Sequence, residues 1–418
     1  MIVKYLKNKE IRQSVLLLST TVAVMVLLLA TNYFLTRVLG KTEFGNYALI
    51  INIFTFCQVV FNFGFFYSIS RLIALSDQEA ENRELYAIGL ILVLTLFVLM
   101  SVCLVGYVLF FGGAVGTKTL TGIMISIPFA WIFLFNSFNE LLLQGSNKIE
   151  LLSFSRFFPK AIFLVVVIPI YFVAQKTSIT PMLLCFFASS IIPFLYIIIK
   201  LRPRFKNLKK QFLKVIESNK KFGFNIYLGS LFAVGASSLS GILIGYFGVD
   251  NTEVGYYSIA LQLSAPLSLI PNVMATVFFK KFSGAAFIEP KLSLSMYLTS
   301  AFVLIIILLL AKPVILILYG SEYLTSVVLV YYLAVSSTLY GVADFYNKFM
   351  LSKGKGVELR NASFIVGLTL LVSNLVLIKI LGATGAAIST ILSGLAYLLA
   401  LFYYFNSAKK EIIQSKSI

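Results

Sequence analysis

The chain alternates between long charge-free runs and short segments that carry its charged residues. Cutting the sequence at every Asp, Glu, Lys and Arg leaves twelve charge-free runs of 15 or more residues: 13–36, 44–70, 85–117, 119–139, 161–175, 177–199, 222–249, 254–279, 292–311, 323–343, 361–378 and 380–408. Ionisable side chains are costly in hydrocarbon, and these runs are too long and too apolar for strands. The pattern therefore predicts an all-α integral membrane protein with twelve transmembrane helices.

The composition agrees with this pattern. Of 418 residues, 59% are hydrophobic and 12% are charged, whereas a soluble domain has about 25% charged residues. The chain has no histidine, which excludes histidine metal ligands and histidine general bases. Its three cysteines, Cys57, Cys103 and Cys185, lie in apolar runs and are expected to be packing thiols. There is no G-x-x-x-x-G-K-[ST] phosphate loop, and we expect no metal and no cofactor.

The basic residues predict the orientation of the helices. With both termini in the cytoplasm, 28 of the 34 Lys and Arg residues fall in cytoplasmic segments and 6 fall in outer segments. Cytoplasmic loops of membrane proteins carry such an excess. Topology thus accounts for most of the net charge of +18, and no nucleic-acid partner is needed to explain it.

A basic segment at residues 200–221 divides the chain. It carries nine basic residues and one acid, and it separates an N-terminal six-helix bundle (1–199) from a C-terminal six-helix bundle (222–418). Four apolar residues in it recur at helical spacing with lysines between them: Phe205, Leu208, Phe212 and Val215. This is typical of an amphipathic helix on the inner membrane surface, with its lysines toward anionic lipid headgroups. A solvated linker is the alternative.

The two halves resemble each other. Residues 42–47 (TEFGNY) match residues 252–257 (TEVGYY) at an offset of 210, and Asn62 matches Asn272. Six helices per half is an even number, so both halves enter the membrane from the same side. We therefore expect two pseudo-symmetric bundles around a central cleft.

Polar residues recur within corresponding spans of the two halves. Helix ten carries Asp344, Asn347 and Lys348, and the equivalent positions of helix four, at an offset of 208, are Asn136, Asn139 and Glu140. Asp344 and Lys348 could neutralise each other as an i,i+4 pair. Alternatively, the residues form a polar stripe that faces an aqueous cleft, where Asp344 binds a proton or a cation. The recurrence of the stripe in two helices favours the second account.

Several cations lie near the ends of spans. The run 161–175 would rise only about 22 Å as a helix, so Lys160 must be drawn below the headgroups. Its ammonium either snorkels to the inner surface or lies in a cavity. Arg71 and Lys280 raise the same alternatives. The amides of Asn62 and Asn272 serve either helix–helix hydrogen bonding or function.

Twelve helices in two halves, a basic middle segment and the sequence of residues 35–47 (LTRVLGKTEFGNY) resemble the polysaccharide-biosynthesis flippases. The resemblance is greatest to the O-antigen (Wzx-type) transporters of the multidrug/oligosaccharidyl-lipid/polysaccharide exporter superfamily. It implies alternating-access export of an undecaprenyl-diphosphate-linked repeat unit from the cytoplasmic to the periplasmic leaflet of a bacterial inner membrane. It also implies an O-antigen polymerase as a functional partner.

For an undecaprenyl-diphosphate-linked sugar substrate, the polar residues within the spans become candidates for binding the substrate and for ion coupling. The candidates for diphosphate contact are Arg71, Lys160, Lys280 and Lys348, because cations lower the cost of moving a diphosphate through a low-dielectric region. The candidates for sugar hydroxyls are Asn62, Asn136 and Asn272. Asp344 and Glu140 are the candidates for ion coupling.

Other functions remain open. A cation- or proton-coupled multidrug exporter of the same superfamily would be expected to carry more intramembrane acids than Glu140 and Asp344. A flippase for the peptidoglycan precursor would share the diphosphate chemistry. A membrane-embedded transferase or polymerase would need catalytic carboxylates or a large outer loop, and the longest charged outer gap is only 312–322. The sequence therefore predicts a transporter and not an enzyme.

Overall fold

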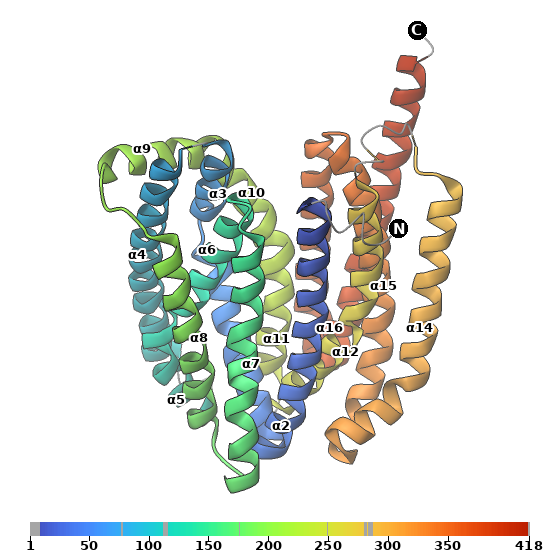
Figure 1. The fold of residues 1–418 in the computed structure, drawn as a ribbon. Helices are drawn as coiled ribbons and strands as arrows, with labels where there is room; N and C mark the ends of the chain where they lie inside the picture. Colours follow the sequence, from blue (N-terminus) through green and yellow to red (C-terminus); the bar gives the residue numbers. More distant parts are fainter. Residues whose placement is uncertain are drawn as a thin grey trace. The chain divides into compact units, whose positions relative to one another are not determined.

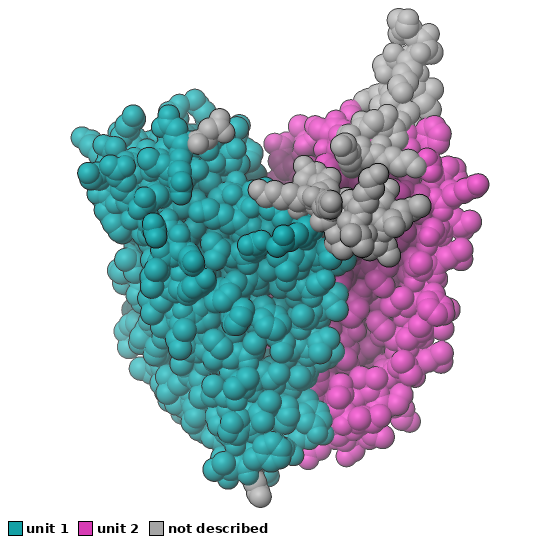
Figure 2. Space-filling model, in the orientation of Figure 1, with its two compact units in different colours: residues 1–231 teal, residues 232–418 magenta. Residues whose placement is uncertain are grey.

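The structure is a computed structural model that describes residues 9–76, 78–111, 116–174, 176–248, 250–279, 282 and 287–416. Within these ranges all regular secondary structure is helical (Figure 1). The chain divides into two compact units, which Figure 2 shows in different colours. Unit 1 comprises Met1–Leu231 and unit 2 comprises Phe232–Ile418.

Unit 1 begins with α2 (Lys9–Val60), a 52-residue helix. A straight helix of this length would measure about 78 Å, against a hydrocarbon core of about 30 Å. The helix breaks at Gly40, whose backbone angles are φ 70° and ψ 172°. α2 therefore supplies the first span and the start of the second.

The second span contains a further break. Residues 61–64 form a turn, in which Phe63 and Gly64 have positive φ angles of 47° and 84°. The helix resumes as α3 (Phe65–Leu75), which completes the span.

Four more spans complete the first half. Their helices are α4 (Glu79–Phe111), the pair α5 (Thr117–Ser126) and α6 (Trp131–Gly145), α7 (Ile149–Ala174) and α8 (Ile179–Leu201). The short 3₁₀ turn η2 (Ile127–Phe129) joins α5 to α6, and the two parts of this span meet at 52°. α7 and α8 contain prolines, which membrane helices tolerate because neighbouring groups satisfy the freed backbone atoms.

The basic segment folds within unit 1. It contains the short helix α9 (Leu208–Ser218), which runs across the ends of the spanning helices of this unit (Figure 1). One turn of π-helix, η3 (Asn219–Gly223), and α10 (Phe224–Ser230) follow. A second π-turn, η4 (Leu231–Gly235), leads into α11 (Ala236–Phe247), so the division between the units falls inside the seventh span.

Unit 2 supplies the remaining spans. Its helices are α12 (Thr252–Val277), α14 (Pro290–Tyr319), α15 (Thr325–Ser352) and α16 (Gly356–Lys416), with the 3₁₀ turn η5 (Ser321–Tyr323) between α14 and α15. The 61-residue α16 breaks at Gly382 (φ 56°, ψ −135°) into the eleventh and twelfth spans. α12, α15 and α16 pack against one another around buried aromatic and aliphatic side chains such as Phe345 and Phe349.

The predicted fold class is confirmed. Eight described helices are long and apolar enough to cross a membrane, or nine when the bent pair α5–α6 counts as one span. Dividing α2 at Gly40 and α16 at Gly382, and including the interrupted seventh span, gives twelve among the described residues. The central cleft between the bundles stays a prediction, as do the bundle boundaries at 199 and 222.

Candidate functional site

Three charged side chains gather in unit 1, where α6 packs against α7. Glu140 of α6 forms an ion pair with Arg156 of α7, and both side chains are partly exposed. One turn further along α7, the Lys160 ammonium donates a hydrogen bond to the Arg156 carbonyl at 3.2 Å. The cluster therefore holds two cations and one carboxylate. Its net positive charge suits an anion.

Lys160 lies well inside its span. The helix rises about 21 Å from Lys160 to Ala174, less than the roughly 30 Å of a hydrocarbon core. The ammonium is half-buried and points back one helical turn, toward Ile149 and the predicted cytoplasmic end. This direction is the one in which a snorkelling lysine extends.

The other unit 1 candidates lie in different surroundings. Asn62 is buried in the break of the second span, and its Nδ2 lies 3.5 Å from the Ser137 hydroxyl of α6. Asn136, the residue before Ser137, is exposed. Arg71 is exposed near the end of α3, with its guanidinium 4.2 Å from the centre of the Phe222 ring.

A second polar cluster surrounds Asp344 in unit 2. The Tyr397 hydroxyl of α16 donates to the Asp344 carboxylate at 3.2 Å and accepts a 2.7 Å hydrogen bond from the Asn347 amide of α15. The side-chain amide of Asn272 on α12 and the Lys348 charge also act on the Asp344 carboxylate. Three helices thus meet at this single acid. Lys280, a candidate for the diphosphate, lies outside the described residues.

Hydroxyls extend this cluster along α15 and α16. Tyr340, one turn before Asp344, shares a 2.7 Å hydrogen bond with Ser393. The Thr390 hydroxyl, nearly one turn before Ser393, donates to Ser336 at 3.2 Å. A polar seam therefore joins the two helices within unit 2.

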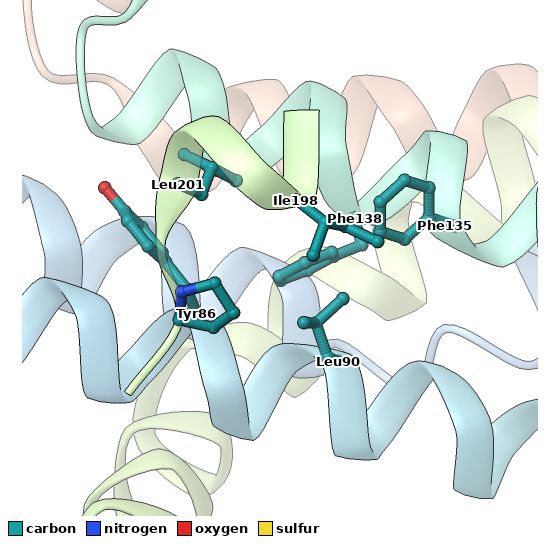
Figure 3. A pocket seen from close by; sticks show the side chains of 7 residues that line it. Tyr86, Leu90, Phe135, Phe138, Ile198 and Leu201 are labelled. Carbon is teal, nitrogen blue, oxygen red and sulfur yellow. The ribbon is translucent and has the colours of Figure 1, made fainter. Parts of the chain in front are cut away.

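A pocket in unit 1 is not a substrate site. It lies between α4, α6 and the end of α8, and Figure 3 shows its side chains. The lining residues are Tyr86, Leu90, Phe135, Phe138, Ile198, Leu201 and Pro203. The rings of Tyr86, Phe135 and Phe138 are almost fully buried, and no charged group lines the gap. This is a packing space in the apolar core.

The sequence matches the polysaccharide biosynthesis protein family over residues 11–283, well over half of the chain. The chain belongs to this family. No curated protein gave a significant match.

Solved structures of transporters share the fold of this family member. The lipid II flippase MurJ in an inward closed conformation superposes with a TM-score of 0.75 at 14% identity, covering 95% of this chain and 90% of that one. An inward-facing multidrug resistance MATE transporter of the MOP superfamily gives 0.70 at 14% identity, with 97% and 99% covered. A MOP superfamily transporter from Pyrococcus furiosus gives 0.59 at 14% identity, with 97% and 96% covered. At such identities the likeness establishes the fold.

Arg156 and Tyr397 were not among the candidate site residues drawn from the sequence. Arg156 carried a signal, because it precedes Lys160 by one turn in a span that must begin early. Tyr397 carried none, since its place in the apolar run 380–408 does not distinguish it from neighbouring tyrosines such as Tyr403. Only the packing of α16 on α15 brings its hydroxyl to Asp344.

Proposed function

We propose that this protein is a flippase for undecaprenyl-diphosphate-linked oligosaccharides, specifically O-antigen repeat units. It would move them from the cytoplasmic to the periplasmic leaflet of a bacterial inner membrane by alternating access at a cleft between the bundles. The observation that carries the proposal is the net positive cluster of Arg156, Lys160 and Glu140 inside a spanning region of a polysaccharide biosynthesis family member. The lipid II flippase among the solved structures of this fold supports it.

In this proposal the cations receive the diphosphate. Arg156 and Lys160 of unit 1 and Lys348 and Lys280 of unit 2 contact its oxygens, with Arg71 near the end of α3. A phosphate accepts charge-assisted hydrogen bonds from guanidinium and ammonium groups. Glu140 competes with the diphosphate for Arg156, because the carboxylate already occupies that guanidinium.

The amides and acids have separate roles. Asn62, Asn136 and Asn272 contact sugar hydroxyls, and Asp344 takes up the coupling ion, with Glu140 as the second candidate. At Asp344 a proton fits the surroundings better than a metal ion. The Lys348 charge acts on the same carboxylate, so its ammonium would repel a metal ion held there. The O-antigen polymerase is the proposed protein partner.

Deletion and complementation in the native strain test the proposal. Loss of the gene is expected to abolish surface glycan and to accumulate unpolymerised lipid-linked repeat units on the inside. Arg156→Ala, Lys160→Ala and Lys348→Ala should each lower glycan display about tenfold or more, because each removes a hydrogen bond to a charged group. Lys312→Ala, an exposed lysine of α14, is the matched control and should restore display fully.

Two outcomes would contradict the proposal in different ways. Full display with both Lys160→Ala and Lys348→Ala would refute the cationic site. Unchanged glycan together with altered drug sensitivity in the deletion strain would identify a multidrug exporter, the function that the MATE likeness favours. Accumulation of the peptidoglycan precursor instead would identify that lipid as the cargo.

A further inference from the structure

The helix α9 exposes both apolar and basic side chains. Phe205, just before it, is 59% exposed, and Phe212 and Leu213 on it are 39% and 57% exposed. Six lysines of this region are exposed: Lys206, Lys209, Lys210, Lys214, Lys220 and Lys221. The one acid of the basic segment, Glu217, pairs with Lys221 at 2.6 Å, which lowers the pKa of that carboxyl. A helix with this distribution is suited to lie in the interface of an anionic membrane.

The ends of α9 fix its depth. The preceding span ends at Leu201, and the next apolar helix, α10, begins at Phe224. The helix therefore lies where two spans leave the hydrocarbon, at the level of the lipid headgroups. Basic residues near such a surface are attracted to anionic lipids.

One face of α9 is fastened to α4. Asn207 and Gln211 each donate a 3.0 Å hydrogen bond to the buried Glu84 carboxylate, and Lys214 pairs with Glu81. Val215 is fully buried on the same face. The side chains that remain available to lipid are thus Phe205, Phe212, Leu213 and the neighbouring lysines.

The residues after α9 hold the break in the second span. The Asn219 amide donates to the Phe63 carbonyl at 3.1 Å, and the Tyr227 hydroxyl donates to the Val60 carbonyl at 2.8 Å. The Ser68 hydroxyl in turn donates to the side-chain Oδ1 of Asn219 at 3.1 Å. A broken helix in a membrane frees backbone groups that must find partners, and these side chains supply them.

The contact depends on two glycines. A Cβ on Gly223 would lie 2.0 Å from the Ser68 hydroxyl and 2.4 Å from the Gly64 carbonyl oxygen, so the two backbones touch at these positions. The turn at residues 61–64 therefore packs directly against η3, the segment that follows α9.

We propose that α9 binds the anionic lipids of the adjacent leaflet and that Asn219 and Tyr227 transmit its position to the break in the second span. Anionic lipid then holds the break in its hydrogen-bonded form. When α9 leaves the surface, Asn219 and Tyr227 withdraw and the Val60 and Phe63 carbonyls lose their partners. The proposal concerns regulation by lipid and does not depend on the identity of the cargo.

The surface contact is tested with a fluorescent reporter. Trp131 is the chain's only tryptophan, so Phe212→Trp in a Trp131→Phe background places a single indole on α9. In vesicles of brominated phosphatidylcholine with phosphatidylglycerol, bromine should quench this indole, and quenching should fall when phosphatidylglycerol is omitted. Replacing Lys206, Lys209 and Lys210 by Ala should remove the dependence on phosphatidylglycerol, whereas Lys312→Ala and Lys379→Ala should not. Equal quenching with and without phosphatidylglycerol would overturn the lipid contact.

The coupling is tested by hydrogen exchange of the full chain in the same vesicles. Amide exchange in residues 61–68 should slow when phosphatidylglycerol is added. Asn219→Ala should raise that exchange roughly fivefold, the effect of one lost hydrogen bond on local opening, and should leave quenching at position 212 intact. The control is Ser230→Ala, whose hydroxyl donates to the Tyr227 carbonyl of its own helix. Amide exchange in residues 61–68 that changes neither with phosphatidylglycerol nor with Asn219→Ala would overturn the coupling. Neither test uses a transport substrate, so failure of the proposed flippase function would leave both results unchanged.

Discussion

At the scale of single residues, two glycines interrupt long helices between consecutive spans. Gly40 has φ 70° and ψ 172°, and Gly382 has φ 56° and ψ −135°. Such angles are essentially restricted to glycine, because a Cβ would clash with the local backbone. Beside Gly382, the Glu253 carboxylate accepts the Ala383 N–H at 2.8 Å, which satisfies one donor at the start of the twelfth span.

We predict that Gly40→Ala lowers the free energy of unfolding by about 1–3 kcal/mol, the cost of such backbone strain. Apart from the local backbone, no atom lies within 4 Å of the added methyl group, so the loss would come from backbone strain alone. Thermal unfolding of the purified protein in detergent measures it. Gly106→Ala is the matched control, since Gly106 sits in α4 with equally open space and without a positive φ. An equal effect of the two substitutions would contradict the prediction.

We predict that Glu253→Ala lowers the free energy of unfolding by about 1 kcal/mol, comparable to losing a helix cap. Glu253 lies at the start of α12 but accepts a hydrogen bond at the start of a span 130 residues away in sequence. The comparison is Glu322→Ala, an exposed acid in η5, in the same unfolding assay. If Glu322→Ala were the more damaging of the two, the cap would not be the cause.

At the scale of elements, buried polar pairs connect helices that hydrophobic packing alone leaves free to slide. In unit 2 the Asn374 amide of α16 donates to the Ser240 hydroxyl of α11 at 2.8 Å, and both residues are fully buried. Hydrogen bonds of this kind contribute modestly to helix association in membranes, because the unfolded chain finds other partners.

A double-mutant cycle of Ser240→Ala and Asn374→Ala should therefore give a coupling energy of about 0.6 kcal/mol, and no more than about 1.7 kcal/mol. Unfolding of the four proteins in detergent provides the values. The control cycle combines Ser240→Ala with Ser363→Ala. The Ser363 hydroxyl of α16 donates to the Leu359 carbonyl of its own helix, so this cycle should show no coupling. A cycle with zero coupling at Ser240 and Asn374 would show that the pair does not tie the helices together.

At the scale of the whole molecule, the distribution of charge predicts the topology. The basic residues divide 28 to 6 between the two sides under a cytoplasmic N-terminus, and such an asymmetry orients membrane proteins. Lys118 at the start of α5 and Lys210 on α9 are both exposed and fall on opposite predicted sides.

We predict that Lys118→Cys reacts with an impermeant thiol reagent on intact spheroplasts, whereas Lys210→Cys reacts only after the membrane is opened. The background carries Ala at Cys57, Cys103 and Cys185, the three native thiols. Mass spectrometry of the labelled protein reports both sites. The reverse pattern would place the termini outside the cytoplasm.

The sequence by itself determined the number of spans and, as a prediction, their orientation. A charge in hydrocarbon is costly wherever it occurs, so Arg37, Lys41 and Glu43 mark the boundary near Gly40 even though helix flanks it on both sides. The break at residues 61–64 escaped this signal because it lies inside the charge-free run 44–70.

Only the tertiary structure decided which polar groups meet. Asn219 and Tyr227 reach the break at 61–64 from more than 150 residues away, and Tyr397 reaches Asp344 across 53 residues. Such pairings depend on how far each helix is rotated about its own axis when it packs. Because a run of apolar residues is compatible with many rotations, the contacts form only when the neighbouring helices fix one of them.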